Sequence, residues 1–113
     1  MPEKAFQKCF LEAVDAAFSS LGDSAKQSIY YHLESKFMIP REDIPCRVED
    51  FETGLEKIFG VGTRFLEVLI MKELHENMGP EVDVLKWEED KEFKFIDYVK
   101  AAERNFSQKK RKN

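Results

Sequence analysis

Apolar residues recur at spacings of three and four along most of this chain, and glycine or proline interrupts the repeat. This spacing places the apolar side chains on one face of an α-helix. The interruptions fall at Gly22, Pro40, Gly60, Gly62 and Pro80. Glycine readily adopts the backbone of a helix end, and proline lacks the N–H that a helix interior needs. The pattern therefore predicts an all-α fold, a compact bundle of about five helices.

The predicted helices differ in how much of their circumference is apolar. Their approximate bounds are residues 3–21, 24–37, 48–59, 63–78 and 88–107, with a short helical turn at 41–45. The helix over residues 63–78 is apolar around more than half of its circumference, so we expect it at the centre of the bundle. Residues 81–87 alternate weakly, but a single short strand has no partner in this sequence, so they are predicted to be a connector.

The length of the chain, 113 residues, suffices for one core, since 42% of the residues are hydrophobic and ten are Phe. Residues 1–107 are predicted to form a single helical domain. The longest apolar run, Val68 to Met71, is far shorter than the roughly 18 residues that a membrane span needs. Residues 1–4 do not lead into the apolar stretch of a signal peptide. We expect a cytoplasmic protein with no membrane association.

The net charge of −4 is unevenly distributed along the chain. Residues 109–112 hold four of the eighteen basic residues, which leaves fourteen basic against twenty-two acidic residues, a net charge of −8, in residues 1–108. An acidic body repels the phosphate backbone of nucleic acids, and four basic residues offer only weak, salt-sensitive attraction. Nucleic acid is therefore an unfavoured partner. Residues 108–113 are predicted to be a disordered basic tail.

The middle of the chain resembles a family of small helical domains. The resemblance is carried by Leu21-Gly22-Asp23-Ser24, Ile29 to Glu34, Ile44-Pro45, Phe51, and Leu55 to Thr63. These segments are similar to the Nitrosopumilus output domain family, an archaeal module seen alone or attached to signalling proteins, over about residues 6–78. The resemblance implies an all-helical sensory or output module. It implies no catalytic or ligand-binding residue in this chain.

Gly60 and Gly62 lie where a phosphate-binding loop could precede a helix. The spacing argues against such a loop, because Phe65 stands where a third glycine is needed and no predicted strand precedes it. We predict instead a close helix–helix turn. Gly60 is expected to adopt a left-handed backbone, and Gly62 or Thr63 to cap the next helix.

The histidines and cysteines give no pattern typical of a metal or catalytic site. His32 and His75 have no second ligand at a zinc-like spacing, and Cys9 and Cys46 form no CxxC pair. Cys46 precedes Arg47 near a helix start, which could stabilise a thiolate, but no catalytic histidine signature accompanies it. We predict reduced thiols, no metal, no cofactor and no enzymatic activity.

The last helix carries a narrow apolar stripe that is typical of a helix–helix seam. Its members are Phe95, Val99, Ala102 and Phe106, and Trp87 stands at the entrance of the helix. Tryptophan often anchors protein interfaces, so these five residues are the candidate interface, with a second copy of the chain as a possible partner. The alternative is that they close the core of the domain itself.

These observations favour a non-enzymatic protein-interaction module, a signalling or regulatory domain that could form a homodimer through its last helix. Two alternatives remain. A nucleic-acid-binding regulator would use the helices before and after the glycine turn, although Glu67, Glu73 and Glu76 give no basic recognition face. A small-ligand-binding helical domain would need an internal cavity, which a sequence does not reveal.

Overall fold

The computed structural model describes residues 4–78 and 94–111. Within them the chain forms α1 (Lys4–Ser19), α2 (Asp23–Phe37), the 3-10 helix η1 (Arg41–Cys46), α3 (Val48–Phe59), the 3-10 turn η2 (Gly60–Gly62), α4 (Thr63–Met78) and α5 (Phe95–Arg111). No strand occurs in these two ranges. The predicted all-α class with five helices is confirmed.

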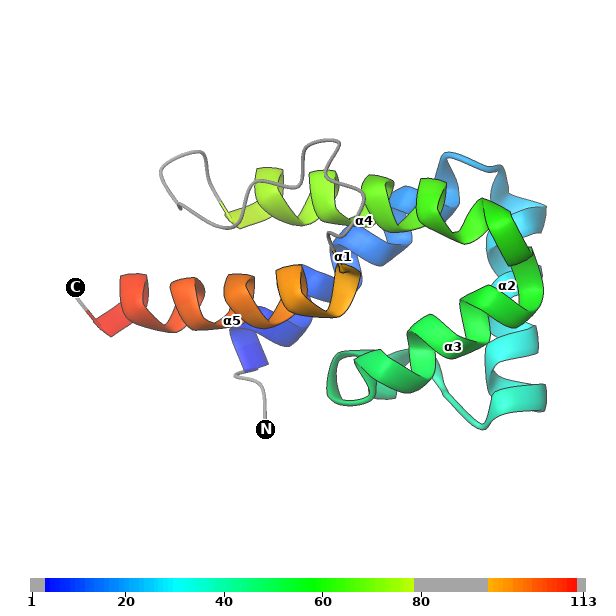
Figure 1. The fold of residues 1–113 in the computed structure, drawn as a ribbon, viewed down its shortest axis with the longest axis horizontal. Coiled ribbons are helices and arrows are strands. Elements are labelled where there is room, and N and C mark those ends of the chain that lie inside the picture. Colours follow the sequence, from blue (N-terminus) through cyan, green and yellow to red (C-terminus); the bar gives the residue numbers. More distant parts are fainter. Residues whose placement is uncertain (1–3, 79–93, 112–113) are drawn as a thin grey trace.

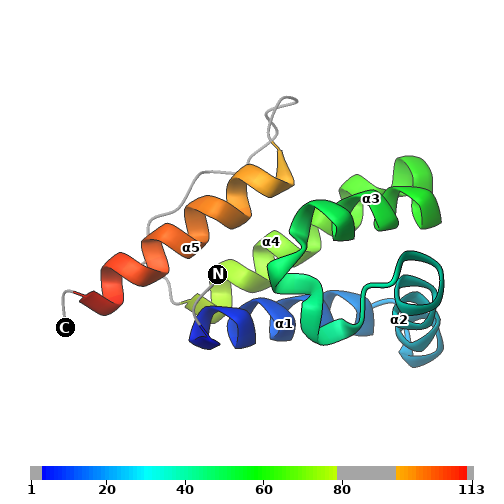
Figure 2. The same cartoon turned by 90° about the horizontal axis from the view of Figure 1, so that it is seen from below.

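Helices α1 and α4 pack along each other and form the centre of the bundle (Figure 1). The inward face of α1 is aromatic and includes Phe6, Phe10 and Phe18, each at most 1% exposed. From α4, Ile70 and Leu74 are fully buried against them. Helix α5 runs alongside α4, as the view from below also shows (Figure 2). The predicted central position of the helix over residues 63–78 is therefore confirmed, although α1 shares it.

A polar network ties α2 and η1 to α1. The Tyr30 hydroxyl on α2 donates to Asp15 Oδ1, and Arg41 in η1 donates to both carboxylate oxygens of Asp15, with 3.0 Å between Arg41 Nε and Oδ1. Burial alone would raise the pKa of Asp15, but the hydrogen bonds from Arg41 and Tyr30 outweigh it and lower that pKa. Burial and the adjacent carboxylate raise the pKa of Tyr30. Three elements are thus joined at one carboxylate.

In the turn between α3 and α4, the backbone of Gly60 agrees with the prediction in its φ angle but not in its ψ angle. Gly60 has a φ of +59°, as predicted, but its ψ of −126° is that of a type II′ turn rather than a left-handed helix. The Thr63 hydroxyl lies 2.8 Å from the carbonyl oxygen of Gly60 and 3.1 Å from that of Leu55. Thr63, the first residue of α4, therefore hydrogen-bonds carbonyl groups at the C-terminal end of α3 and in the turn.

Helix α5 differs from the prediction at its C-terminal end. Its helical backbone continues to Arg111, into the segment 108–113 that was predicted to be a disordered tail. The residues involved are Gln, Lys and Arg, which are good helix formers, and no glycine or proline interrupts them. The predicted start near residue 88 falls outside the described residues.

Candidate functional site

The predicted interface stripe on α5 lies inside the domain. Phe95 and Ala102 are fully buried and Val99 is 4% exposed. The ring centroid of Phe95 lies 6.4 Å from that of Phe10 on α1 and 6.5 Å from that of Phe51 on α3. The alternative stated above therefore holds, because these side chains close the core of their own chain.

Of the two other members of the candidate interface, the structure describes one. Phe106 is half-buried, and its ring meets the ring of Phe6 edge-on at 5.9 Å between centroids. Phe106 extends the packing of α5 on α1 toward the N-terminal end of α1. Trp87 lies outside the described residues.

A cleft of about 510 Å³ opens beside this helix. Its apolar lining comes from α1, η1, the start of α3 and α5, and the residues are Phe6, Pro45, Val48, Ile96 and Val99, of which Phe6 and Val99 are at most 4% exposed. Segments from the start, the middle and the end of the chain therefore meet there. Of the described residues, these make the strongest candidate for a binding site, because ligand sites favour concave apolar surfaces between elements.

Charged side chains of both signs also line the cleft, and they are here called its rim. They are Arg47, Glu49 and Asp50 at the start of α3, and Lys100 and Glu103 on α5. Arg47 Nε lies 3.2 Å from Asp50 Oδ2, and its Nη1 donates to the carbonyl oxygen of Met38. One of these charged groups, Arg47, is therefore held by an ion pair within the wall of the cleft, which is lined by apolar and charged side chains in similar number.

Cys46 lies at the edge of this cleft with its side chain exposed. The side-chain amide of Gln7 donates toward its sulfur, with 3.8 Å between Nε2 and Sγ. An amide cannot accept a proton from a thiol, so this contact does not activate a nucleophile. Cys9 is buried instead, and burial, together with the charge of Glu12, raises the pKa of its thiol. Both thiols are free, in agreement with the prediction.

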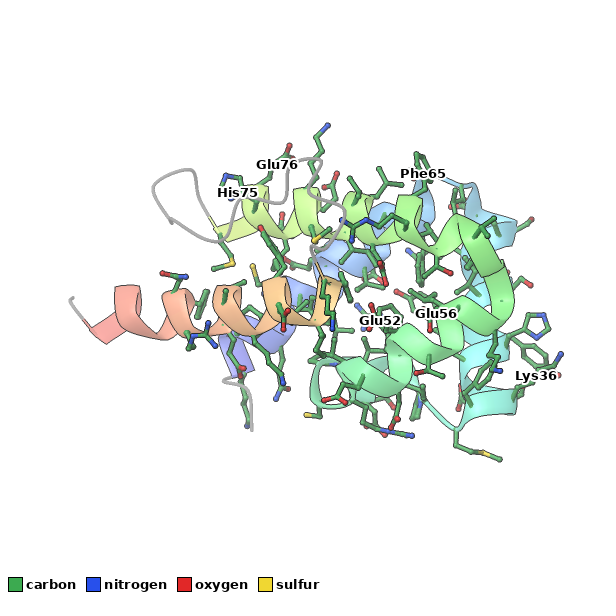
Figure 3. The ribbon with its side chains drawn as sticks, in the orientation of Figure 1. Lys36, Glu52, Glu56, Phe65, His75 and Glu76 are labelled. Atoms are coloured by element: carbon green, nitrogen blue, oxygen red, sulfur yellow. The ribbon has the colours of Figure 1, made fainter. Side chains whose placement is uncertain are left out.

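A second feature, which the sequence reasoning missed, is a buried carboxyl between α3 and α4. The Glu67 side chain is 8% exposed, and its Oε1 lies 3.9 Å from Arg64 Nη1, an ion pair within α4. Figure 3 shows Glu52 and Glu56 on the side of α3 that faces α4. Burial and these two acidic neighbours raise the pKa of Glu67 to about 8, against the opposing effect of Arg64.

A sequence signal for this burial does exist. Glu67 follows Thr63 by four residues and precedes Ile70 and Leu74 by three and seven, so it occupies an inward position of the α4 repeat. Its charge, in contrast, is typical of a residue that faces solvent. In contrast, Phe65 belongs to the predicted apolar surface of that helix and is 63% exposed.

Two general findings concern the described residues. No group of three or more His, Cys, Asp or Glu side chains in residues 4–78 and 94–111 is arranged to hold a metal ion. Within the same ranges, no helix has both the length and the apolar character required to cross a bilayer.

Comparisons with known proteins identify no relative. No family model matches the chain, and neither the curated proteins nor the solved structures contain a significant match. The resemblance to the Nitrosopumilus output domain family over residues 6–78 remains a prediction.

Proposed function

We propose that this chain is a non-enzymatic interaction module of the signalling or regulatory type, which binds a protein partner in the cleft between η1, α3 and α5. The observation that carries the proposal is the arrangement of that cleft. The cleft is concave and is lined by both apolar and charged side chains, and protein interfaces likewise combine apolar contacts with polar and charged groups.

The contacts of the cleft favour binding over catalysis. Its exposed thiol, Cys46, is paired with the amide of Gln7, and the guanidinium of Arg47 with the carboxylate of Asp50. Nucleophilic catalysis needs a base within hydrogen-bond reach of the nucleophile, and an amide is not a base. A role in recognition uses these same groups without further chemistry.

The two alternatives make different demands on the same surface. A small ligand would occupy the apolar part of the cleft and would not need the rim. A nucleic acid would need an excess of positive charge, whereas the rim has three acidic residues, Glu49, Asp50 and Glu103, and two basic ones. The protein partner is therefore the leading proposal, with the small ligand second.

Charge reversal at the rim tests the proposal. Lys100 is exposed on α5 beside the cleft, and Lys57 is exposed in the last turn of α3, far along that helix from the cleft. Lys100→Glu should abolish co-purification of a specific partner, whereas the matched control Lys57→Glu should not. Equal retention of the partner by both variants would contradict a site at this cleft.

Two further assays on the wild-type chain separate the alternatives. A small molecule that raises the midpoint of thermal unfolding, and loses this effect with Ile96→Glu, would favour ligand binding. A complex with DNA or RNA that persists at physiological salt would favour a nucleic-acid function.

A further inference from the structure

Met38, which directly follows α2, has an unusual backbone. Its φ of +58° and ψ of 39° are left-handed, and no other non-glycine residue in the described ranges has a positive φ. A residue with a Cβ is disfavoured in this conformation and keeps it only where neighbouring groups hold it. On the side of α2, the amide of Ile39 donates to the carbonyl oxygen of Leu33 over 3.0 Å.

The carbonyl group of Met38 is held from outside α2. The last carbonyl groups of a helix have no partner within it, and the helix dipole favours a positive charge beside them. Arg47 Nη1 donates to the carbonyl oxygen of Met38. Arg47 also lines the cleft, so the end of α2 is bound by a side chain of the cleft wall.

The same guanidinium is bound to the first turn of α3. Arg47 Nε lies 3.2 Å from Oδ2 of Asp50, one of the acidic residues of that turn. The side chain of Arg47 is 35% exposed and that of Asp50 is 62% exposed, and an ion pair at such exposure contributes little by itself. The guanidinium is planar and rigid, however, so its two contacts together fix the start of α3 relative to the end of α2.

The segment between these two helices forms one wall of the cleft. The chain leaves α2, turns through η1 and enters α3 (Figure 1). Pro45 and Cys46 of η1 line the cleft together with Val48 of α3. At its first residue, Arg41, η1 is held by the carboxylate of Asp15. Arg47 holds the other end, so the position of this wall depends on its guanidinium.

The remaining charged residues of the rim make no such contact. Glu49, Lys100 and Glu103 form no ion pair with another described side chain. Of the two basic residues that line the cleft, Arg47 is thus bound within the chain, whereas Lys100 is exposed and has no carboxylate beside it. Lys100 is the cation that an incoming acidic group can meet without breaking an existing ion pair.

We propose that Arg47 is a positioning residue of the cleft, which holds the wall formed by η1 and the start of α3, and that Lys100 binds an acidic side chain of the protein partner. Arg47 acts through the wall and does not touch the partner. The inference rests on the proposed function, because it assigns roles within the same cleft.

Arg47→Lys tests the positioning role. Lysine keeps the positive charge but has a single nitrogen, which cannot reproduce the two contacts of the planar guanidinium. Amide hydrogen exchange of the free variant should rise about tenfold in residues 41–47 relative to α1, because local opening of the wall becomes easier. The variant should also lose the partner, while the midpoint of thermal unfolding stays nearly unchanged. Arg104→Lys, at an exposed position of α5, is the matched control and should change none of these.

Three outcomes would overturn the positioning role. Loss of the partner without faster exchange in residues 41–47 would mean that Arg47 binds the partner directly. Faster exchange with the partner retained would mean that the wall does not govern binding. A lower midpoint with an equal rise of exchange in α1 would mean that Arg47 only stabilises the fold.

Two variants at position 100 test the acidic contact. Lys100→Arg keeps the charge and should retain the partner, whereas Lys100→Met keeps only an apolar side chain and should lose it. Retention by Lys100→Met would overturn the assignment of Lys100 as the binding cation. These results are distinguishable from a failure of the proposed function, in which Lys100→Glu also retains the partner. If Lys100→Glu loses the partner but Arg47→Lys changes neither exchange nor binding, only the role of Arg47 is wrong.

Discussion

The ring of Phe95, the first residue of α5, packs against the ring of Phe10 on α1 with 6.4 Å between the ring centroids and 35° between the ring planes. The two residues are 85 positions apart in the sequence. Their contact shows that α5 belongs to the core of the domain, and that its apolar stripe is already covered within the chain. The partner that we propose would therefore bind in the cleft beside α5, which the stripe lines only through Val99.

Truncation of Phe95 tests the role of α5 in the core. Phe95→Ala should lower the free energy of unfolding by about 3–5 kcal/mol, because a fully buried ring leaves a cavity. Chemical denaturation gives the change, and Lys100→Ala on the exposed side of the same helix should shift it by less than about 0.5 kcal/mol. A Phe95→Ala variant of unchanged stability and reduced mass in sedimentation would make the stripe an intermolecular interface instead.

Alanine substitution of the two glycines in the α3–α4 turn tests the backbone geometry of that turn, with Gly62 as the control for Gly60. Gly60→Ala should cost about 1 kcal/mol or more, because a Cβ is disfavoured at a φ of +59°. Gly62 lacks a positive φ, and a Cβ there would meet Phe59 Cβ at an ordinary 3.9 Å, so Gly62→Ala should be nearly neutral. Denaturation midpoints measure both, and equal midpoints for the two variants would refute this account of the turn.

The carboxylate of Asp15 links three elements, so replacing or protonating it should destabilise the fold. Asp15→Asn should reduce stability at neutral pH by about 1–2 kcal/mol through the lost charge-assisted hydrogen bonds. Because the folded pKa of Asp15 is lowered, its contribution is present above the ordinary pKa and disappears as the pH falls through the folded value. Urea denaturation over a range of pH should therefore show wild type and variant converging in acid.

The control for Asp15 is Asp50→Asn, which removes the more exposed ion pair with Arg47 and should cost less than about 1 kcal/mol. A larger decrease in the free energy of unfolding for Asp50→Asn than for Asp15→Asn would show that the hydrogen bonds at Asp15 do not stabilise the fold more than the ion pair at Asp50 does.

Glu67 should give the opposite dependence of stability on pH. Its pKa is raised on folding, so between about pH 4.5 and 8 the folded protein holds a proton that the unfolded chain has released. Stability should fall as the pH rises through this range and level off above it. Glu67→Gln should flatten this dependence and be more stable than the wild type in alkaline solution. A wild-type stability that rises over the same range, after correction for Asp15, would contradict the assignment.

Local patterns predicted the helices well because helix formation depends on nearby residues. The bounds Thr63–Met78 follow from Gly62 before the helix and Gly79-Pro80 after it, and the positive φ of Gly60 follows from its place at a helix end. The stripe on α5 was also recognised. Its partner was not determined, since Phe95 looks the same in sequence whether Phe10 or a second molecule covers it.

The features that the sequence did not indicate depend on residues brought together by the fold. The carboxylate of Asp15 and the guanidinium of Arg41 are 26 positions apart, and each by itself is typical of a solvated helix surface. Glu67 is likewise typical of a solvated helix surface in the sequence, and it is buried only in the folded chain. The cleft could not be predicted either, because its walls come from four separate elements.

The central claim, that a protein partner binds the cleft, is tested most directly by photo-cross-linking from Cys46. A maleimide-linked benzophenone reacts with this exposed thiol, whereas Cys9 is buried. The matched control places the same probe at the other end of α3, in the double variant Cys46→Ser, Val61→Cys, where Val61 is fully exposed. We expect the probe at Cys46 to cross-link a specific protein, Lys100→Glu to abolish this product, and the probe at position 61 not to form it. Identical products from both positions, or a Cys46 product that survives Lys100→Glu, would contradict the account.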